Sequence, residues 1–128
     1  MEDKLWAAAD KLRLMVSMIK ILFICSRNKW RSLTAEKIFH RLNGYDVKSA
    51  GTEDNARIKV TNGHMGWADL IFVMEKKHSR RIKEKFGELL TNKKVICLDI
   101  PDDYKFMDDE LIEILKSRVS EYIDIHKI

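Results

Sequence analysis

Three stretches of this sequence are almost continuously hydrophobic, at residues 19–24, 70–74 and 95–98. Short runs of this kind, rich in β-branched residues, are typical of strands that are buried on both faces of a parallel sheet. Residues 45–49, with the sequence Tyr-Asp-Val-Lys-Ser, are expected to form one further strand. The hydrophobic pattern therefore predicts four short strands.

The segments between these strands have hydrophobic residues at helical spacing. In residues 32–42 they fall on one helix face: Ala35, Ile38, Phe39 and Leu42. The same spacing predicts helices at residues 76–90 and 108–125, with Asp108 as the N-cap of the second. A weaker helix is expected at residues 60–67, because this segment contains two glycines. Strands that alternate with helices predict an α/β fold with a parallel sheet.

Residues 1–17 lie outside this alternation. Their hydrophobic positions have helical spacing, but the acidic residues Glu2, Asp3 and Asp10 are not those of a secretion signal. We expect an N-terminal extension with a helical pattern at residues 1–17 and a single domain at residues 18–128. No hydrophobic run approaches the roughly 20 residues that a membrane-spanning helix needs. A cytoplasmic enzyme without a membrane partner is therefore expected.

Charged residues are unevenly distributed, although the net charge is only +4. Residues 76–94 are mostly basic, and residues 99–113 are mostly acidic. A solvated helix face is the simplest interpretation of the basic segment, and attraction of a phosphorylated protein is the alternative. No recognised nucleic-acid motif accompanies these cations, so a nucleic-acid partner is not expected.

The loop between the first strand and the first helix carries the most informative residues. Cys25 directly follows the strand, and Arg31 and Ser32 begin the helix after five intervening residues. In a tight loop that leads into a helix, the amides converge on one point and the helix dipole attracts an anion. A thiol ionises readily in such surroundings, and the arginine fork binds two phosphate oxygens. The arrangement favours phosphoryl transfer to a cysteine thiolate.

Hydrolysis of a phosphate monoester without a metal needs a nucleophile, charge stabilisation and an acid for the leaving group. Cys25 is expected to supply the first, and Arg31, the Ser32 hydroxyl and the loop amides the second. The carboxyl ends of parallel strands meet at one edge of a sheet, so the acid is expected from the loop after the fourth strand. That loop offers three candidates: Asp99, Asp102 and Asp103.

The remaining reactive residues point to no other site. Cys97 lies in an apolar run and is expected to pack in the core. Two cysteines are too few for a disulfide framework, and their spacing is not that of a metal site. Trp30 is either a pocket wall or a core anchor. The histidines show no partner spacing, and surface or partly buried roles are expected for them: His40, His64, His78 and His126.

Four stretches together carry a family resemblance: residues 21–36, Ser49-Ala50-Gly51-Thr52, residues 69–74 and Ile100-Pro101-Asp102-Asp103-Tyr104. They resemble the phosphate-binding loop, the second and third strands and the acid loop of the low-molecular-weight protein tyrosine phosphatases. The resemblance runs from residue 19 to the C-terminus and implies a three-layer sandwich, a four-stranded parallel sheet flanked by helices. It also implies a phosphatase without metal or cofactor. Such an enzyme acts on phosphorylated proteins or small aryl phosphates through a cysteinyl-phosphate intermediate.

The resemblance implies roles for individual residues. Cys25 takes the place of the nucleophile, Arg31 that of the phosphate clamp and Asp102 that of the general acid, with Asp103 as the alternative acid. Other residues of the loop and of the acid loop are implied to bind the substrate: Ser26, Arg27, Asn28, Lys29, Trp30, Ser32 and Tyr104. Ser49, together with Asn28, is implied to hold the loop in shape.

Departures from the family pattern leave alternative functions open. Arg27 stands where the family has glycine, Trp30 stands where it has a second loop cysteine, and the short span 52–69 predicts an open cleft wall. A catalytically weak module that binds phosphate or phosphoproteins is therefore an alternative. Arsenate reductase activity on the same scaffold is another, although it needs further redox cysteines. The physiological substrate and the oligomeric state are left open.

Overall fold

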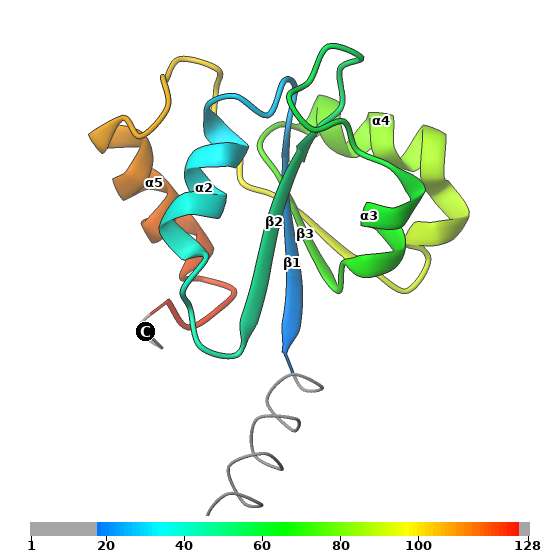
Figure 1. Ribbon diagram of the computed structural model, residues 1–128, viewed down its shortest axis with the longest axis horizontal. Coiled ribbons are helices and arrows are strands. Elements are labelled where there is room, and N and C mark those ends of the chain that lie inside the picture. Colours follow the sequence, from blue (N-terminus) through cyan, green and yellow to red (C-terminus); the bar gives the residue numbers. More distant parts are fainter. Residues whose placement is uncertain (1–17, 126–128) are drawn as a thin grey trace, which may run out of the picture.

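The computed structural model describes residues 18–125. Four strands form one parallel sheet in the order β2-β1-β3-β4 (Figure 1). Their bounds are β1 Ile19–Cys25, β2 Tyr45–Gly51, β3 Leu70–Val73 and β4 Lys94–Cys97. The predicted four-stranded parallel sheet is confirmed.

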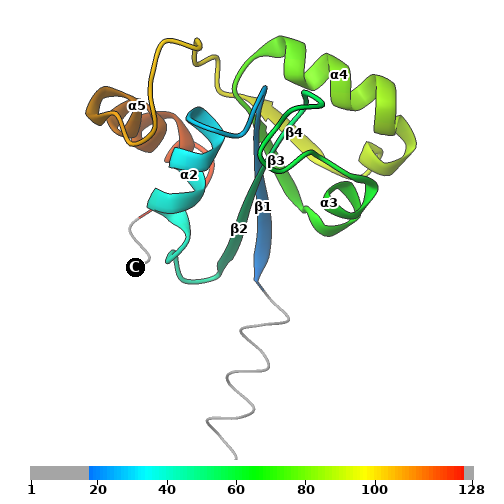
Figure 2. The same cartoon turned by 45° about the horizontal axis from the view of Figure 1, so that its top comes forward.

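Helices cover both faces of the sheet, so the domain has three layers (Figures 1 and 2). One face is covered by α2 (Arg31–Phe39) and α5 (Asp109–Val119), and the other by α3 (Asn62–Trp67) and α4 (Lys76–Phe86), with a 3-10 turn (Gly87–Leu90) after α4. Side chains of β1 alternate between the two cores: Phe23 packs toward α2 and α5, and Ile24 toward α3 and α4. The central strand is thus buried on both faces, which explains its continuous hydrophobic run.

Several elements end differently from the predictions. The helix predicted at residues 32–42 ends at Phe39, and the one predicted at residues 76–90 ends at Phe86 and continues as a 3-10 turn. The closing helix, predicted at residues 108–125, ends at Val119. Ile123 still packs into the core, because its amide turns back to the Val119 carbonyl. Hydrophobic spacing therefore continues past the end of the helix. β2 extends further than predicted, to Gly51, where it pairs with Cys25.

Within residues 18–125, no helix is both long and apolar enough to cross a membrane. The expected cytoplasmic location stays a prediction. The extension predicted at residues 1–17 lies outside the described residues, as does His126.

Candidate active site

A cavity of about 330 Å³ opens at the carboxyl ends of the strands. Its lining comes from the loops after β1, β2 and β4 and from the start of α4: Cys25, Ser26, Arg27, Lys29, Trp30, Arg31, Glu53, Lys77 and Asp102. Cys25, Arg31 and Asp102 are the three residues predicted to be catalytic. They meet because β3 pairs with both β1 and β4, which brings the loops after β1 and β4 to one edge of the sheet.

The loop after β1 has the backbone arrangement of an anion site. Three successive carbonyls, those of residues 25–27, accept hydrogen bonds of 2.9 to 3.0 Å from amides in residues 52–57. Among the described residues, four loop amides donate to no protein atom: those of Ser26, Arg27, Lys29 and Trp30. Free amides in a turned loop ahead of a helix attract an anion.

Gly51 allows the two loops to approach this closely. A Cβ atom at residue 51 would lie 2.6 Å from the Ser26 carbonyl oxygen and 2.7 Å from the Ala56 Cβ. Any side chain here would therefore push residues 52–57 away from the carbonyls that they hold. The glycine of the Ser-Ala-Gly-Thr stretch thus supports the loop shape by close backbone packing.

The Cys25 sulfur lies among hydrogen-bond donors. Its Sγ is 2.9 Å from the Ser32 Oγ and accepts the Asn28 amide at 3.3 Å. Asn28 Nδ2 also donates to the Ser32 Oγ at 2.8 Å, which leaves the hydroxyl proton for an acceptor of its own. The Ala50 carbonyl is an alternative acceptor, but at 3.5 Å it is too distant to compete well. Ser32 is therefore placed to stabilise a thiolate.

Two residues predicted to bind the substrate lie behind the loop. Asn28 and Ser32 are fully buried and do not line the cavity, so their contacts support the sulfur and the loop. The left-handed residue of the loop is Asn28, with φ of 58°, a conformation that asparagine tolerates well. The φ of Arg27 lies outside the left-handed region, so an arginine fits without backbone strain at the position where the family pattern has glycine.

Ser49 makes its hydrogen bond to α2, and its implied role in holding the loop in shape stays a prediction. Ser49 Oγ donates to Glu36 Oε1 of α2 at 2.8 Å. Among the described residues, no hydrogen bond joins Ser49 to Asn28. Ser49 therefore fastens β2 to α2, the helix that follows the loop.

The Arg31 guanidinium is buried and tethered from one side. Its Nη1 donates to Glu75 Oε1 at 2.5 Å and to the Ile100 carbonyl at 2.8 Å, and the side chain is 1% exposed. Its Nε lies 3.6 Å from Asp102 Oδ1 across the cavity. Anchoring at Nη1 fixes the plane of the fork, which is what bidentate phosphate binding requires.

Glu75 is a site residue that the sequence analysis missed. Glu75 is the second residue after β3, and Cys25 ends β1, so an acidic residue at the same edge of the sheet was the signal that could have identified it. Burial alone raises the pKa of Glu75, but the hydrogen bond and charge of Arg31 outweigh burial and lower it. Glu75 is therefore held as a carboxylate. A buried arginine without such a partner would be strongly destabilising.

His78 is a second missed residue, and the expected surface or partly buried role for it is wrong. It is fully buried, and its Nε2 lies 2.9 Å from the Ser26 Oγ. The Glu75 amide donates to its Nδ1 at 3.0 Å, so the ring proton resides on Nε2 and is donated to Ser26. The Ser26 hydroxyl proton is then free to point into the cavity that Ser26 lines.

Neutral His78 makes the stability of the fold depend on pH. Burial, reinforced by the charge of Arg31, lowers the pKa of His78 from 6.5 to about 4. Between these values the unfolded chain binds more protons, so stability is full above pH 6.5 and is lost as pH falls toward 4. The expected loss is roughly 3 kcal/mol in the free energy of unfolding. Urea unfolding of wild type and His78→Gln at several pH values measures it as a difference in slope.

The exposed His40 supplies the control for this measurement. His40→Gln should keep the wild-type pH dependence, whereas His78→Gln should flatten it between pH 6.5 and 4. Parallel curves for wild type and His78→Gln would show that His78 is not held neutral in the folded protein.

The acid loop places only one of its residues in the cavity. Asp102 lines the cavity with its side chain half exposed, whereas Asp103 and Tyr104 do not line it. Tyr104 packs against the core, so its predicted place in the cleft is wrong. Trp30, 42% exposed, is the aromatic residue among the lining residues, and of its two expected roles the pocket wall is confirmed.

Contacts at both ends fix this loop. Arg118 Nη1 donates to the carbonyls of Leu98 and Asp99, and the Met107 amide donates to Thr34 Oγ1 at 2.9 Å. The wall expected to be open is partly closed, because residues 52–57 lie against the loop carbonyls and Glu53 lines the cavity.

The sequence matches no protein-family model and no curated protein. Solved structures do match. The tyrosine phosphatase Wzb from Escherichia coli K30, a complex with phosphate, is 24% identical, with a TM-score of 0.68 over 82% of this chain and 96% of that one. SP-PTP, a low-molecular-weight protein tyrosine phosphatase from Streptococcus pyogenes, is 16% identical, with a TM-score of 0.67 over 87% and 100%.

This chain has the fold of the low-molecular-weight protein tyrosine phosphatases. The same fold occurs in the YwlE arginine phosphatase from Geobacillus stearothermophilus, which is 23% identical, with a TM-score of 0.62 over 80% of this chain and 91% of that one. At such identities the low-molecular-weight phosphatase fold is shared, while substrate and activity have to be argued from the cavity itself.

Proposed function

We propose that this protein is a metal-independent phosphatase that hydrolyses phosphotyrosine or other aryl phosphate monoesters through a cysteinyl-phosphate intermediate. The observation that carries the proposal is the position of the Cys25 sulfur. It sits in a loop with free amides and lines one cavity with the tethered Arg31 and the Asp102 carboxyl group. The phosphatases that share this fold support the proposal.

In the first step the Cys25 sulfur attacks phosphorus. The sulfur–phosphorus bond forms, the bond to the leaving oxygen breaks, and Asp102 donates its proton to that oxygen. The loop amides and the Arg31 fork stabilise the charge on the transferring group. Asp102 Oδ1 lies 3.6 Å from Arg31 Nε, so the carboxyl group and the fork lie side by side in the cavity that Cys25 lines.

In the second step Asp102, now a carboxylate, takes a proton from a water molecule. The water oxygen attacks phosphorus, the sulfur–phosphorus bond breaks, and inorganic phosphate leaves with the thiolate restored. The Ser32 hydroxyl, 2.9 Å from the sulfur, stabilises the thiolate as the leaving group. One residue thus acts as acid and then as base.

An aryl phosphate fits the lining of the cavity better than phosphoarginine does. The Trp30 ring offers a face for stacking against an aromatic leaving group. The guanidinium of phosphoarginine would instead face the lining cations, Arg27, Lys29 and Lys77, which repel it. Phosphotyrosine peptides are therefore expected to be better substrates than phosphoarginine peptides.

Arsenate reduction is disfavoured by the position of the other cysteine. Cys97 is level with Val73 of β3, which in turn is level with Ile24 of β1. Two strand spacings separate it from β1, or about 10 Å, and a disulfide needs Cα atoms within about 7 Å. Cys97 therefore cannot form a disulfide with Cys25 unless the backbone moves.

Hydrolysis of p-nitrophenyl phosphate in the presence of EDTA tests the proposal, and neighbouring aspartates provide the comparison. Asp102→Asn is expected to lower kcat about 100-fold, because it removes the proton donor. Asp103→Asn, a change in an exposed residue outside the cavity, should stay within about threefold of wild type. No turnover by wild type would favour the binding module, and an equal effect of both changes would remove Asp102 from the acid role.

A further inference from the structure

Carboxylates around the mouth of the cavity are already paired with cations of the protein. Glu53 Oε1 accepts a hydrogen bond from Arg81 Nη1 at 2.8 Å, and Glu75 is held by Arg31. Asp54, in the loop beside Glu53, pairs with Lys59. These acids therefore leave little negative charge to neutralise other cations nearby.

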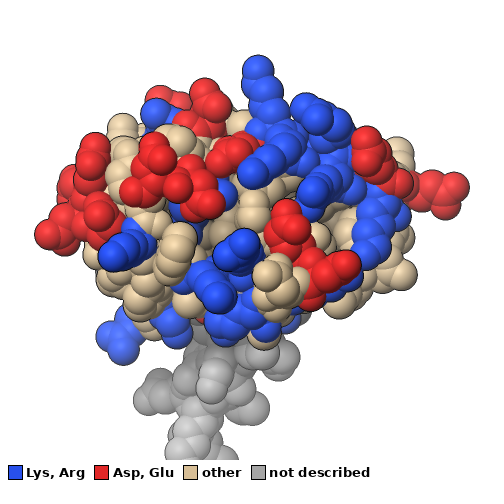
Figure 3. Space-filling view, turned by 90° about the horizontal axis from the view of Figure 1, so that it is seen from above, with Lys and Arg blue, Asp and Glu red and all other residues tan. Residues whose placement is uncertain are grey.

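Five exposed cations from the loops after β1 and β2 and from the first two turns of α4 have no carboxylate partner within 4 Å among the described residues. We call them the basic rim: Arg27, Lys29, Arg57, Lys76 and Arg80. Basic side chains gather on the α4 side of this surface and acidic ones on the α5 side (Figure 3). The free positive charge therefore lies mainly away from the α5 side of this surface (Figure 3).

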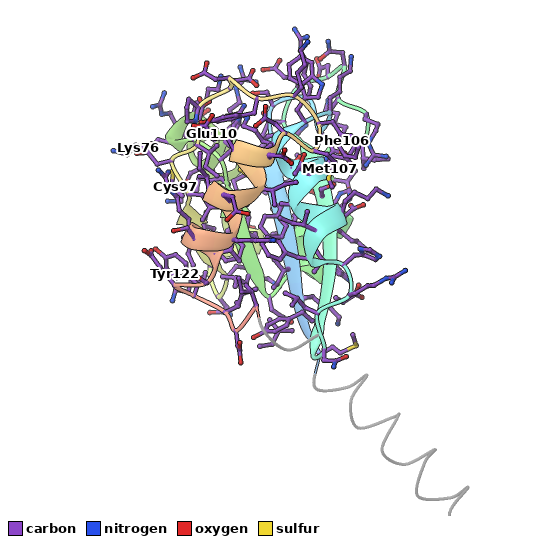
Figure 4. All side chains as sticks on the ribbon, turned by 90° about the vertical axis from the view of Figure 1, so that its left-hand side faces the viewer. Lys76, Cys97, Phe106, Met107, Glu110 and Tyr122 are labelled. Atoms are coloured by element: carbon purple, nitrogen blue, oxygen red, sulfur yellow. The ribbon has the colours of Figure 1, made fainter. Side chains whose placement is uncertain are left out.

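The first two turns of α4 run along the mouth. Glu75 at its N-cap contacts Arg31, Lys77 lines the cavity, and Arg81 binds the lining residue Glu53. Lys76 lies between the first two of these positions and points away from the molecule into solvent (Figure 4), and Arg80 lies one turn further along the same face. Neither cation lines the cavity, but both lie on the turns of α4 that carry the lining residue Lys77 and the Glu53 partner Arg81.

We propose that the site takes a phosphorylated protein segment whose neighbouring residues are acidic and bind to the basic rim. This inference rests on the proposed function and names its substrate class. When the phosphorylated side chain of a substrate lies in the cavity, the residues that flank it in the substrate lie over α4. Carboxylates at those flanking positions can then pair with the basic rim. A bound phosphate and the lining residues nearly neutralise one another, so the rim cations outside the cavity, Arg57, Lys76 and Arg80, supply the attraction for further negative charge.

The expected gain is modest because the cations are exposed. Single exposed ion pairs contribute a factor of about 1.5 to 5, so two or three of them give roughly tenfold tighter binding. The gain should shrink toward nothing in 0.5 M salt, where charges are screened over about 4 Å.

Binding of two peptides that carry a non-hydrolysable phosphonate analogue of phosphotyrosine tests the inference. One peptide has glutamates on both sides of the analogue, and the other has glutamines. Fluorescence anisotropy with wild type should give roughly tenfold tighter binding of the glutamate peptide. The double variant Lys76→Gln, Arg80→Gln should lose most of this preference. The control Lys83→Gln, Lys85→Gln removes the same charge from the far end of α4, about 10 Å away, and should keep it.

Equal affinity for the two peptides, no binding of either, or an equal loss in both double variants would overturn the inference. Displacement of the glutamate peptide by a single-stranded oligonucleotide at lower concentration than by unlabelled peptide would overturn it in favour of a nucleic acid. Turnover of p-nitrophenyl phosphate reports on the proposed function separately. A preference for the glutamate peptide without any turnover would support the role of the basic rim and contradict the proposed phosphatase activity. The protein would then be a phosphoprotein-binding module.

Discussion

Replacing Cys25 by serine is expected to lower kcat for p-nitrophenyl phosphate by about 10⁴-fold or more. A serine hydroxyl stays protonated at neutral pH and is a weak nucleophile. Among the described residues, the hydrogen-bond partners of the Cys25 sulfur are the Ser32 hydroxyl and the Asn28 amide, and neither is a base that would activate it. Steady-state hydrolysis measures the loss. The side chains are similar in size, so the folded structure should persist.

Cys97→Ser makes the same chemical change in β4 and provides the control. It should keep kcat within about twofold, because Cys97 does not line the cavity. If Cys25→Ser retained more than about a hundredth of the wild-type rate, another residue would have to be the nucleophile, and the neighbouring Ser26 would be the first to examine.

Arg31→Lys is expected to lower kcat about 10³-fold while weakening inhibition by inorganic phosphate about tenfold or less. Lysine keeps the positive charge, so an anion is still attracted. It cannot donate to Glu75, the Ile100 carbonyl and a phosphate oxygen in one plane, so the fork is lost where charge develops. Hydrolysis rates and phosphate inhibition constants, measured together, separate the two effects.

The exposed Arg41, far from the cavity, supplies the control, because Arg41→Lys should change neither quantity. Urea unfolding of Arg31→Lys belongs in the same experiment, since the partly buried Glu75 loses its hydrogen bond from Arg31 Nη1. Equal losses in kcat and in phosphate affinity would mean that Arg31 only holds the phosphate and does not act specifically in the transition state.

The position of the site could be predicted because strand order in parallel sheets constrains it. Cys25, Arg31 and Asp102 are far apart in the sequence, but the loops that carry them follow strands whose ends share one edge. The same reasoning applies to the segment after β3, which carries Glu75 and then, in the first turn of α4, His78. Both residues were missed because their spacing suggests the exposed face of a basic helix, and only the packing of α4 turns them inward.

Irregular segments limited the predictions elsewhere. The acid loop has no periodicity, so the sequence could not tell which of Asp102, Asp103 and Tyr104 faces the cavity. Left-handed φ values at Asp99 and Met107 set the path of the acid loop. Neither residue is a glycine, so the sequence gives no sign of these conformations. The hydrogen bond of Ser49 to Glu36 depends on how β2 packs against α2, and the family resemblance gave no information about that contact.

The supporting contacts form one connected set behind the cavity. The N-terminus of α4 holds Arg31 through Glu75 and Ser26 through His78, while Asn28 and Ser32 hold the sulfur from the other side. None of these four supporting residues lines the cavity. Precise placement of reactive groups depends on such buried neighbours, so their loss should lower activity without removing a reacting atom.

The central claim is that the Cys25 sulfur carries the phosphoryl group during turnover. Asp102→Asn, mixed with p-nitrophenyl phosphate and quenched within milliseconds, should accumulate the intermediate because the water is no longer activated. Peptide mapping by mass spectrometry should then place the phosphate on Cys25. Phosphate on Ser26 or His78, or steady turnover by this variant with unmodified Cys25 at every quench time, would contradict the account.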